Sequence, residues 1–386
     1  MWRKVTLFHS LKGPESGILL RCNPFKQNNI CWSDVVSQTI TYSLNLNTIM
    51  KKLFPFFLLS LICFAVDAQD KPFLTKSFNS SQIRELDVKT SGGGITVYGT
   101  NDSETVVQVF IKSNNGKELS QSEIEDHLKD YTLEINREGQ TLVCMAQNNR
   151  KNNWKNGLSI SFKVYAPEQL DTDLLTSGGG IRMKNLEGNL RFATSGGGLE
   201  LVELRGNVKG RTSGGGIKIK DSEDIIDLAT SGGGIMAENV AGQVKLSTSG
   251  GGIKLYDMYG MISATTSGGS ILVEGLEGEL KTGTSGGSIR LADISGSVKA
   301  STSGGSINAD IREVGEYLVL HSSGGGIDVD LPFDKGMDLD IKGNRVTMNN
   351  YRNFDGRKDK DRIVGTINGG GAEVSISTSS GSVNIR

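Results

Sequence analysis

The chain has 386 residues, of which 51 are Gly, 6% are aromatic and 36% are hydrophobic, and its formal net charge is −1. Because the glycines do not recur every third residue, a collagen-like triple helix is excluded. The apolar content and the regular pattern described below exclude an intrinsically disordered chain.

A targeting segment follows an N-terminal stretch, residues 1–49, that matches nothing in the rest of the chain. It has two basic residues after Met50, an apolar run from Leu53 to Val66 and small residues before Gln69. This combination is typical of a secretory signal peptide. We therefore interpret 1–49 as a non-native upstream extension and 50–68 as the signal peptide. The alternative is one long leader or anchor over residues 1–68.

The remaining chain is slightly acidic. Removing residues 1–68 takes away seven Lys/Arg and three Asp/Glu, which leaves 35 against 40 and a net charge of −5. A nucleic-acid partner requires a basic face, so none is expected. Cys144 is the one cysteine left, and its apolar neighbours predict a buried thiol without a disulfide framework. No apolar C-terminal segment follows, so no transmembrane anchor is expected in the mature chain.

Residues 69–175 are expected to form a first coil and an N-terminal cap. The motif Thr90-Ser-Gly-Gly-Gly-Ile95 appears here once. Ser120-Gln-Ser-Glu123 is a capping box that predicts one short helix. A cap is needed because the end coil of a stack would otherwise expose an unpaired edge, and Trp154 is expected to pack in it. Strands are expected at 106–111, 131–135, 141–146 and 158–165.

The segment 176–321 repeats one unit at an interval of 18 residues. Within each unit apolar and polar residues alternate, which is typical of a strand with one buried face. Eighteen residues are too few for a βαβ crossover, so the unit predicts two or three short strands stacked on the next copy. We expect an all-β fold, a right-handed parallel β-solenoid (β-helix) with 18-residue coils and an N-terminal cap containing one short helix. TSGGG or TSGGS begins at Thr176, Thr194, Thr212, Thr230, Thr248, Thr266, Thr284 and Thr302.

The alternation and the turn residues predict the local geometry of each coil. Thr194 shares its phase with Leu190 and Phe192, so the repeated threonine is expected to point inward. Its hydroxyl is expected to bond to other threonines or to the turn backbone. Both the triple glycine and the Asn185 to Gly188 segment indicate tight turns, because Gly permits positive φ and Asn or Asp tolerates it.

Residues 322–386 are expected to form irregular C-terminal coils and a cap. The period slips after Thr302, and the next SSGGGI copy begins at Ser322. Residues 344–362 are polar and charged, which predicts a loop. Two further copies of the motif, beginning at Asn368 and Thr378, indicate that coils resume before the end of the chain.

These motifs resemble a known bacterial family of candidate adhesins, β-strand-repeat proteins of unknown function related to the head domain of candidate auto-transporter adhesins. The resemblance rests on the signal peptide, the opening LDVKTSGGGITV (Leu86–Val97), the SGGGI and SGGSI repeats, and the closing INGGGAEVSISTSSGSV (Ile367–Val383). It covers nearly all of the chain after residue 68. It implies a β-solenoid and an adhesin-like role, and it implies no catalytic residues.

The glycines do not match a ligand-binding motif. Phosphate loops and dinucleotide fingerprints need a glycine-rich segment between a strand and a helix, and no helix is expected after SGGG. Calcium-binding repeats need an Asp at a fixed place in every turn, whereas the residue after Ile varies from Arg182 to Glu200 and Lys218. An ice-binding array needs outward threonines. We therefore expect no small-molecule cofactor and no metal site.

An enzyme is a weaker alternative. A carbohydrate-active β-helix enzyme needs clustered carboxylates in longer coils. Here His127 and His321 are far apart without metal-ligand spacing, and Asp328, Asp330 and Asp334 cluster only loosely. We therefore predict that the protein is not an enzyme and has no catalytic residues.

One row of cations is predicted on the outward face. It consists of Arg191, Lys209, Lys245, Lys281 and Lys299, and Asp227 and Ser263 interrupt it. The row could bind an anionic glycan or lipopolysaccharide, although outward charges also keep strands from pairing with other chains.

From these patterns we expect an exported adhesin-like protein in the periplasm, on the outer cell surface or outside the cell. Its partner would be an extracellular glycan, a matrix protein or an envelope protein. The alternative is a periplasmic structural scaffold or envelope-stress accessory.

Overall fold

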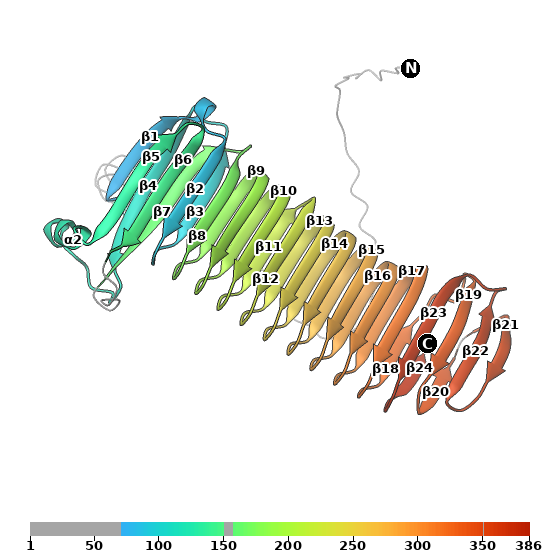
Figure 1. Cartoon of the computed structure of the whole chain (residues 1–386). Helices are drawn as coiled ribbons and strands as arrows, with labels where there is room; N and C mark the ends of the chain where they lie inside the picture. The colour runs from blue at the N-terminus through green and yellow to red at the C-terminus, as the bar shows by residue number, and fades with distance from the viewer. Residues whose placement is uncertain (1–70, 150–156, 350) are drawn as a thin grey trace, which may run out of the picture. The chain divides into compact units, whose positions relative to one another are not determined.

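The computed structural model describes residues 71–149, 157–349 and 351–386 (Figure 1). The predicted extension 1–49, the predicted signal peptide 50–68 and Trp154 lie outside the described residues. The described residues belong to one compact unit, Gln69–Arg386. They form an all-β structure with a single α-helix and one short 3-10 turn.

Long strands that pair in parallel make up the middle of this unit (Figure 1). Within residues 171–302 the paired residues of neighbouring copies are 18 positions apart, as in Leu199 with Ile217 and Ile235 with Ile253. Each side chain therefore stacks on its equivalent in the next copy, which is why one sequence unit can repeat. The strands are β8 (Asp171–Thr176), β9 (Ile181–Thr194), β10 (Leu199–Thr212), β11 (Ile217–Ser222), β12 (Ile225–Thr230), β13 (Ile235–Thr248), β14 (Ile253–Thr266), β15 (Ile271–Thr284), β16 (Ile289–Thr302) and β17 (Ile307–Ser322).

Each long strand bends at a corner near its middle. Asn185 and Asp257 have φ of 56° and 51°, and Gly188 and Gly260 follow with φ of 152° and 102°. The predicted turn residues are confirmed, but in β9 and β14 the strand continues through the corner instead of dividing into short strands. The corner changes the inward phase, which places the next inward residue three positions after Met183, at Leu186.

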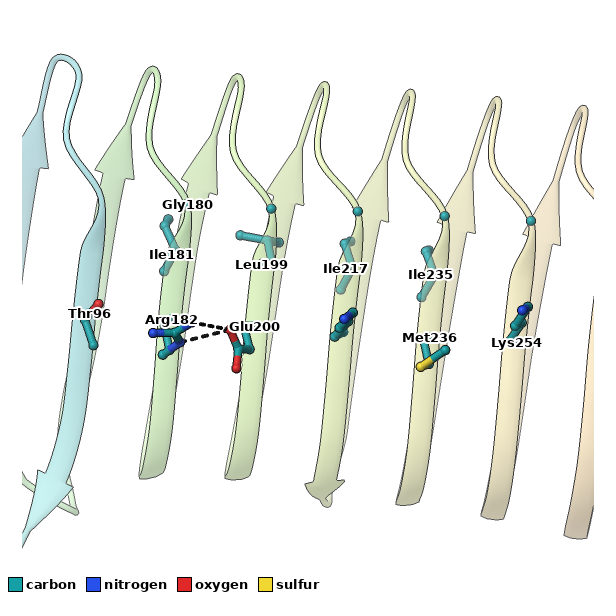
Figure 2. A pocket seen from close by; sticks show the side chains of 15 residues that line it. Thr96, Gly180, Ile181, Arg182, Leu199, Glu200, Ile217, Ile235, Met236 and Lys254 are labelled. Atoms are coloured by element: carbon teal, nitrogen blue, oxygen red, sulfur yellow. Dashed lines mark hydrogen bonds and ion pairs between the residues drawn. The ribbon is translucent and has the colours of Figure 1, made fainter. Parts of the chain in front are cut away.

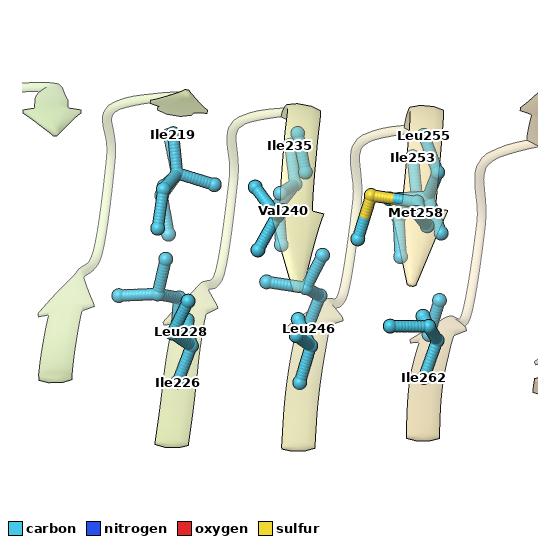
Figure 3. Close-up of a cluster of buried hydrophobic side chains, with 14 of the residues drawn as sticks. Ile219, Ile226, Leu228, Ile235, Val240, Leu246, Ile253, Leu255, Met258 and Ile262 are labelled. Carbon is cyan, nitrogen blue, oxygen red and sulfur yellow. The ribbon is translucent and has the colours of Figure 1, made fainter. Parts of the chain in front are cut away.

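The two halves of each bent strand face each other across the core (Figure 3). Val240 and Leu255 lie in one layer, and Leu228, Leu246 and Ile262 lie in the other. Val240, Leu228, Leu246 and Leu255 have no exposed surface. Because every coil contributes to both layers, burial is continuous from coil to coil.

The repeated threonines point inward, as predicted. From Thr194 to Thr302 their exposed fraction is 2–7%. The hydroxyl of Thr248 donates to the carbonyl of Gly233 at 2.7 Å and accepts from the amide of Gly251 at 3.3 Å. Of the two arrangements expected from the sequence, the structure has the bond to the turn backbone.

Thr248→Val is expected to lower the free energy of unfolding by about 1–3 kcal/mol, because valine leaves the Gly233 carbonyl and the Gly251 amide unpaired. Thr248→Ser is the control, since Ser322 makes the same two bonds at 2.8 and 3.0 Å. Urea unfolding midpoints measure both variants. Equal midpoints for the two would show that the hydroxyl contributes nothing.

The triple glycine has a different cause from the one predicted. No glycine in the TSGG turns between 176 and 306 has positive φ, so these turns do not need glycine's conformational freedom. They need its small size. A Cβ on Gly197 would lie 2.2 Å from the carbonyl oxygen of Gly179, and one on Gly233 would lie 2.2 Å from that of Gly215. The middle glycine is required because consecutive turns sit directly on one another.

The N-terminal part contains the first TSGGG turn and the strands around it. Strands β2 (Glu85–Thr90) and β3 (Ile95–Thr100) flank the first TSGGG turn and pair in parallel with β8 and β9. All four further strands expected in this part are present. They are β4 (Glu104–Ser113), β5 (Tyr131–Glu138), β6 (Thr141–Asn148) and β7 (Leu158–Pro167), accompanied by β1 (Leu74–Asn79) and the 3-10 turn η1 (Ser80–Gln82).

The one α-helix, α2 (Gln121–Leu128), starts at the predicted capping box. The hydroxyl of Ser120 accepts from the amide of Glu123, and a carboxylate oxygen of Glu123 accepts from the amide of Ser120 at 2.8 Å. Hydrogen bonds from Ser120 and Lys117 lower the pKa of Glu123 to about 2. The helix start therefore follows from its local sequence.

The C-terminal part corrects one prediction. The expected loop at 344–362 contains strand β20 (Arg345–Met348), which is parallel to β24 (Ser382–Ile385), and β21 (Phe354–Lys358), which pairs antiparallel with β22 (Arg362–Ile367). The polar composition was misleading, because Val346 and Met348 alone supply the buried face of β20, while β21 is held by backbone pairing. The other strands are β18 (Ile327–Asp330), β19 (Met337–Lys342) and β23 (Ala372–Thr378).

Candidate functional site

A groove of about 720 Å³ crosses the strands on the outer face of β9, β10, β11, β13 and β14 (Figure 2). It lies just after the TSGG turns, where Gly180 is followed by the buried Ile181 and the exposed Arg182. The groove exists because the strand leaves each turn with a glycine on its outer face.

The floor of the groove consists of the third glycine of successive turns, which we call the floor glycines. All five are exposed, and a serine takes the same position in the next three turns, at Ser270, Ser288 and Ser306. A Cβ on Gly234 would lie 3.1 Å from the carbonyl oxygen of Gly252, so a small side chain fits there with a slight adjustment. The fold therefore does not demand these glycines, in contrast to the middle glycines. The floor glycines are Gly180, Gly198, Gly216, Gly234 and Gly252.

One wall is formed by the side chains two positions after the floor glycines, which we call the wall row. Its members stack in register and are Arg182, Glu200, Lys218, Met236 and Lys254. Arg182 and Glu200 form an ion pair at 2.6 Å, and this hydrogen bond raises the pKa of Arg182. Lys218 and Lys254 are exposed and form no ion pair with any residue that the structure describes. The row therefore offers two free cations beside one neutralised pair.

The next outward row is different, because its charges pair with carboxylates. Lys220 lies 2.8 Å from Glu238, and Lys184 lies 3.7 Å from Glu203. The hydrogen bond that Lys220 donates to Glu238 raises the pKa of Lys220. Free positive charge is thus concentrated along the groove and not one row away from it.

The N-terminal end of the groove adjoins a second hollow of about 510 Å³, and Thr96 lines both. Tyr165 and Lys163 line this second hollow. The rings of Tyr98 and Tyr165 stack with centroids 5.5 Å apart, and the ammonium of Lys163 lies 5.1 Å from the centroid of Tyr165. This end therefore combines aromatic surface with a further cation.

The cationic row predicted from the sequence exists. Lys209 pairs in the sheet with Arg191 and Asp227, and Lys281 pairs with Lys299. Part of its charge is neutralised within the protein, because Lys281 lies 2.7 Å from Glu279. The hollow beside Arg191 and Lys209 measures only about 260 Å³.

The side chains considered for catalysis do not come together. His321 is hydrogen-bonded to Ser377 at 2.9 Å. Asp328 accepts from Asn384 at 2.8 Å, and Asp330 pairs with Arg386 at 3.0 Å. Burial raises the pKa of the Cys144 thiol to about 12. Within residues 71–149, 157–349 and 351–386, no group of three or more His, Cys, Asp or Glu could hold a metal ion.

The sequence contains one signal that could have located the groove, the change of the last residue of the motif from glycine to serine. TSGGG and TSGGS differ only in their last residue, and the turns that line the groove all end in glycine, from Gly180 to Gly252. The change from Gly252 to Ser270 marks the end of the groove.

The model of the Toastrack DUF4097 family matches residues 77–386. The chain belongs to this family. The match covers all of the Toastrack repeats together with the parts before and after them, and it confirms the family resemblance inferred from the repeats.

Solved structures that match this chain include three bacterial proteins. One is a candidate adhesin from Parabacteroides merdae, with 11% identity, coverage of 81% of this chain and 95% of the other, and a TM-score of 0.35. A candidate lipid-binding protein from Parabacteroides distasonis has 17% identity, coverage of 82% and 98%, and a TM-score of 0.26. A candidate cell adhesion protein from Clostridium sporogenes has 13% identity, coverage of 82% and 99%, and a TM-score of 0.17. At these values, none of the three likenesses supports a statement about the ligand of this chain. No curated protein matches the sequence.

Across the part of the Toastrack chain that the structure describes, no helix has the length and hydrophobicity needed to span a bilayer.

Proposed function

We propose that this Toastrack protein is an exported, non-enzymatic, adhesin-like protein that binds a glycan or a protein through the outer face of its stacked coils. One observation carries the proposal. The floor glycines open a groove across five strands, and Lys218 and Lys254 beside it form no ion pair within residues 71–149, 157–349 and 351–386. An open groove with unpaired charge is suited to holding a ligand from solution.

The proposal includes a finer account of the architecture. The coils are taken to be right-handed and 18 residues long, because parallel crossovers are almost always right-handed and paired residues are 18 positions apart. Residues 69–175 serve as first coil and N-terminal cap, 176–321 as the regular repeats, and 322–386 as irregular coils and C-terminal cap. A cap at each end would cover the first and the last regular coil and so keep the stack from adding further chains.

The proposed location is the periplasm, the outer surface or the extracellular space, on the strength of the pattern at 50–68. Protease treatment of intact cells that produce the protein tests surface exposure. We expect peptides from 69–386 to be released while a periplasmic control protein stays intact. Protection until the outer membrane is opened would contradict the adhesin-like role and favour a periplasmic scaffold.

A further inference from the structure

We propose that the groove binds a linear anionic glycan that lies across the coils, with its negative groups on Lys218 and Lys254 and its path ending at Ser270. This inference rests on the proposed binding function and adds the class of ligand, its direction and the residues that select it.

The ligand is linear because the floor is continuous in one direction. Successive floor glycines lie on adjacent parallel strands, which are about 4.8 Å apart. The open stretch from Gly180 to Gly252 therefore extends for four strand spacings, roughly 19 Å. At Ser270 the same position carries a side chain, and the hydroxyl of Ser270 accepts from the amide of Ser288 at 3.3 Å. A chain following the floor meets an obstruction there.

The ligand is anionic because the side chains along the groove carry a net positive charge. Three cations and one carboxylate line the groove, and the carboxylate, Glu200, is held by Arg182. Lys218 and Lys254 are separated by two strand spacings, or roughly 10 Å. Lys163 adds a cation at the N-terminal end. Positive charge lining a groove attracts an oppositely charged polymer and speeds its association.

A glycan fits these features better than a peptide. Peptides that bind sheets do so by adding a strand along an unpaired edge, whereas this groove crosses the strands. The floor backbone is already used between coils: the amide of Leu199 donates to Gly216 at 2.9 Å, and that of Ile217 donates to Gly234 at 2.9 Å. The floor therefore offers a flat surface whose backbone groups are not available to hydrogen-bond a peptide strand in register. Charged groups on the ligand must supply the orientation.

Fluorescence anisotropy with labelled polygalacturonate oligomers, a linear polycarboxylate, provides the test. We expect binding by the protein purified after expression of the full chain, weakening as salt is added, and no binding of a neutral linear glucan of equal length. Lys218→Gln/Lys254→Gln should weaken binding by about tenfold or more at low salt. The control Lys209→Gln/Lys245→Gln removes the same charge from the other cationic row and should leave binding within about twofold.

A steric pair of variants tests the groove itself. Gly216→Ser/Gly234→Ser places in the floor the side chain that Ser270 and Ser288 carry, keeps the charge, and should weaken binding about as much as the lysine variant. Ser270→Gly lengthens the floor by one coil and should strengthen binding of longer oligomers. Circular dichroism and the unfolding midpoint verify that all variants are folded.

The outcomes separate this inference from the proposed function. Equal binding of the neutral glucan would overturn the anionic class of ligand. Loss of binding in the Lys209/Lys245 control alone would overturn the groove assignment. Either result would leave a glycan-binding protein. Equal binding of double-stranded DNA or of anionic vesicles would show that the groove attracts polyanions in general. That result would overturn the assignment of a glycan as the ligand. Surface exposure without any polygalacturonate binding would reject the ligand class and retain the adhesin-like role.

Discussion

Gly233→Ala is expected to destabilise the Toastrack unit by about 3 kcal/mol or more, because a single methyl group at this place has no room. The added Cβ would lie 2.2 Å from the carbonyl oxygen of Gly215 and 2.4 Å from its carbonyl carbon. Side-chain overpacking usually costs about 1–3 kcal/mol, since side chains can shift to relieve it. Here the obstacle is backbone that is fixed by the parallel ladder on both sides, so the coils must separate.

The matched control is Gly234→Ser, one residue further along the same turn. Its Cβ would lie 3.1 Å from the carbonyl oxygen of Gly252, and the chain already carries serine at the equivalent Ser270. We expect a loss of less than about 1 kcal/mol, as for a surface substitution. Urea unfolding followed by circular dichroism compares the two variants. If they unfolded at the same urea concentration, close stacking of the turns would not be the reason for the middle glycine.

Ile253→Asp is expected to have the second large effect, about 4 kcal/mol or more, or to prevent folding. Ile253 is 1% exposed and stacks between Ile235 and Ile271 of the neighbouring coils. An aspartate there places a carboxylate in an apolar layer without a partner, and burying an unpaired charge is among the costliest changes a core can suffer. Because neighbouring coils depend on each other, the loss should spread along the stack.

The control is Met261→Asp in the same strand, which makes a comparable exchange at a residue that is 54% exposed. It should shift the free energy of unfolding by no more than about 0.5 kcal/mol. Thermal melts and urea midpoints of both variants give the comparison. A melting temperature of Ile253→Asp that matched that of Met261→Asp would mean that Ile253 does not point inward.

The two kinds of glycine have separate consequences. Middle glycines such as Gly233 hold the coils together, so their replacement should weaken stability and binding together. Floor glycines such as Gly234 shape the outer face, so their replacement should change binding while stability is kept. A variant set covering both positions thus distinguishes a folding defect from a binding defect within one turn.

Features that depend on neighbours along the chain follow from the sequence alone. The 18-residue period, the inward phase of Thr194, the corner at Asn185 and the capping box at Ser120 all follow from local alternation and turn chemistry, and the structure contains each of them.

Other features depend on contacts between residues that are distant in the sequence. Strand β21 exists because β22 pairs with it, which the polar segment 344–362 does not indicate. The middle glycines are required by the coil next to them, and the floor glycines form a groove only because parallel stacking aligns Gly180 with Gly198 and their successors. Contacts between residues that are distant in the sequence determine these properties, so the local conformational preferences of single residues do not predict them.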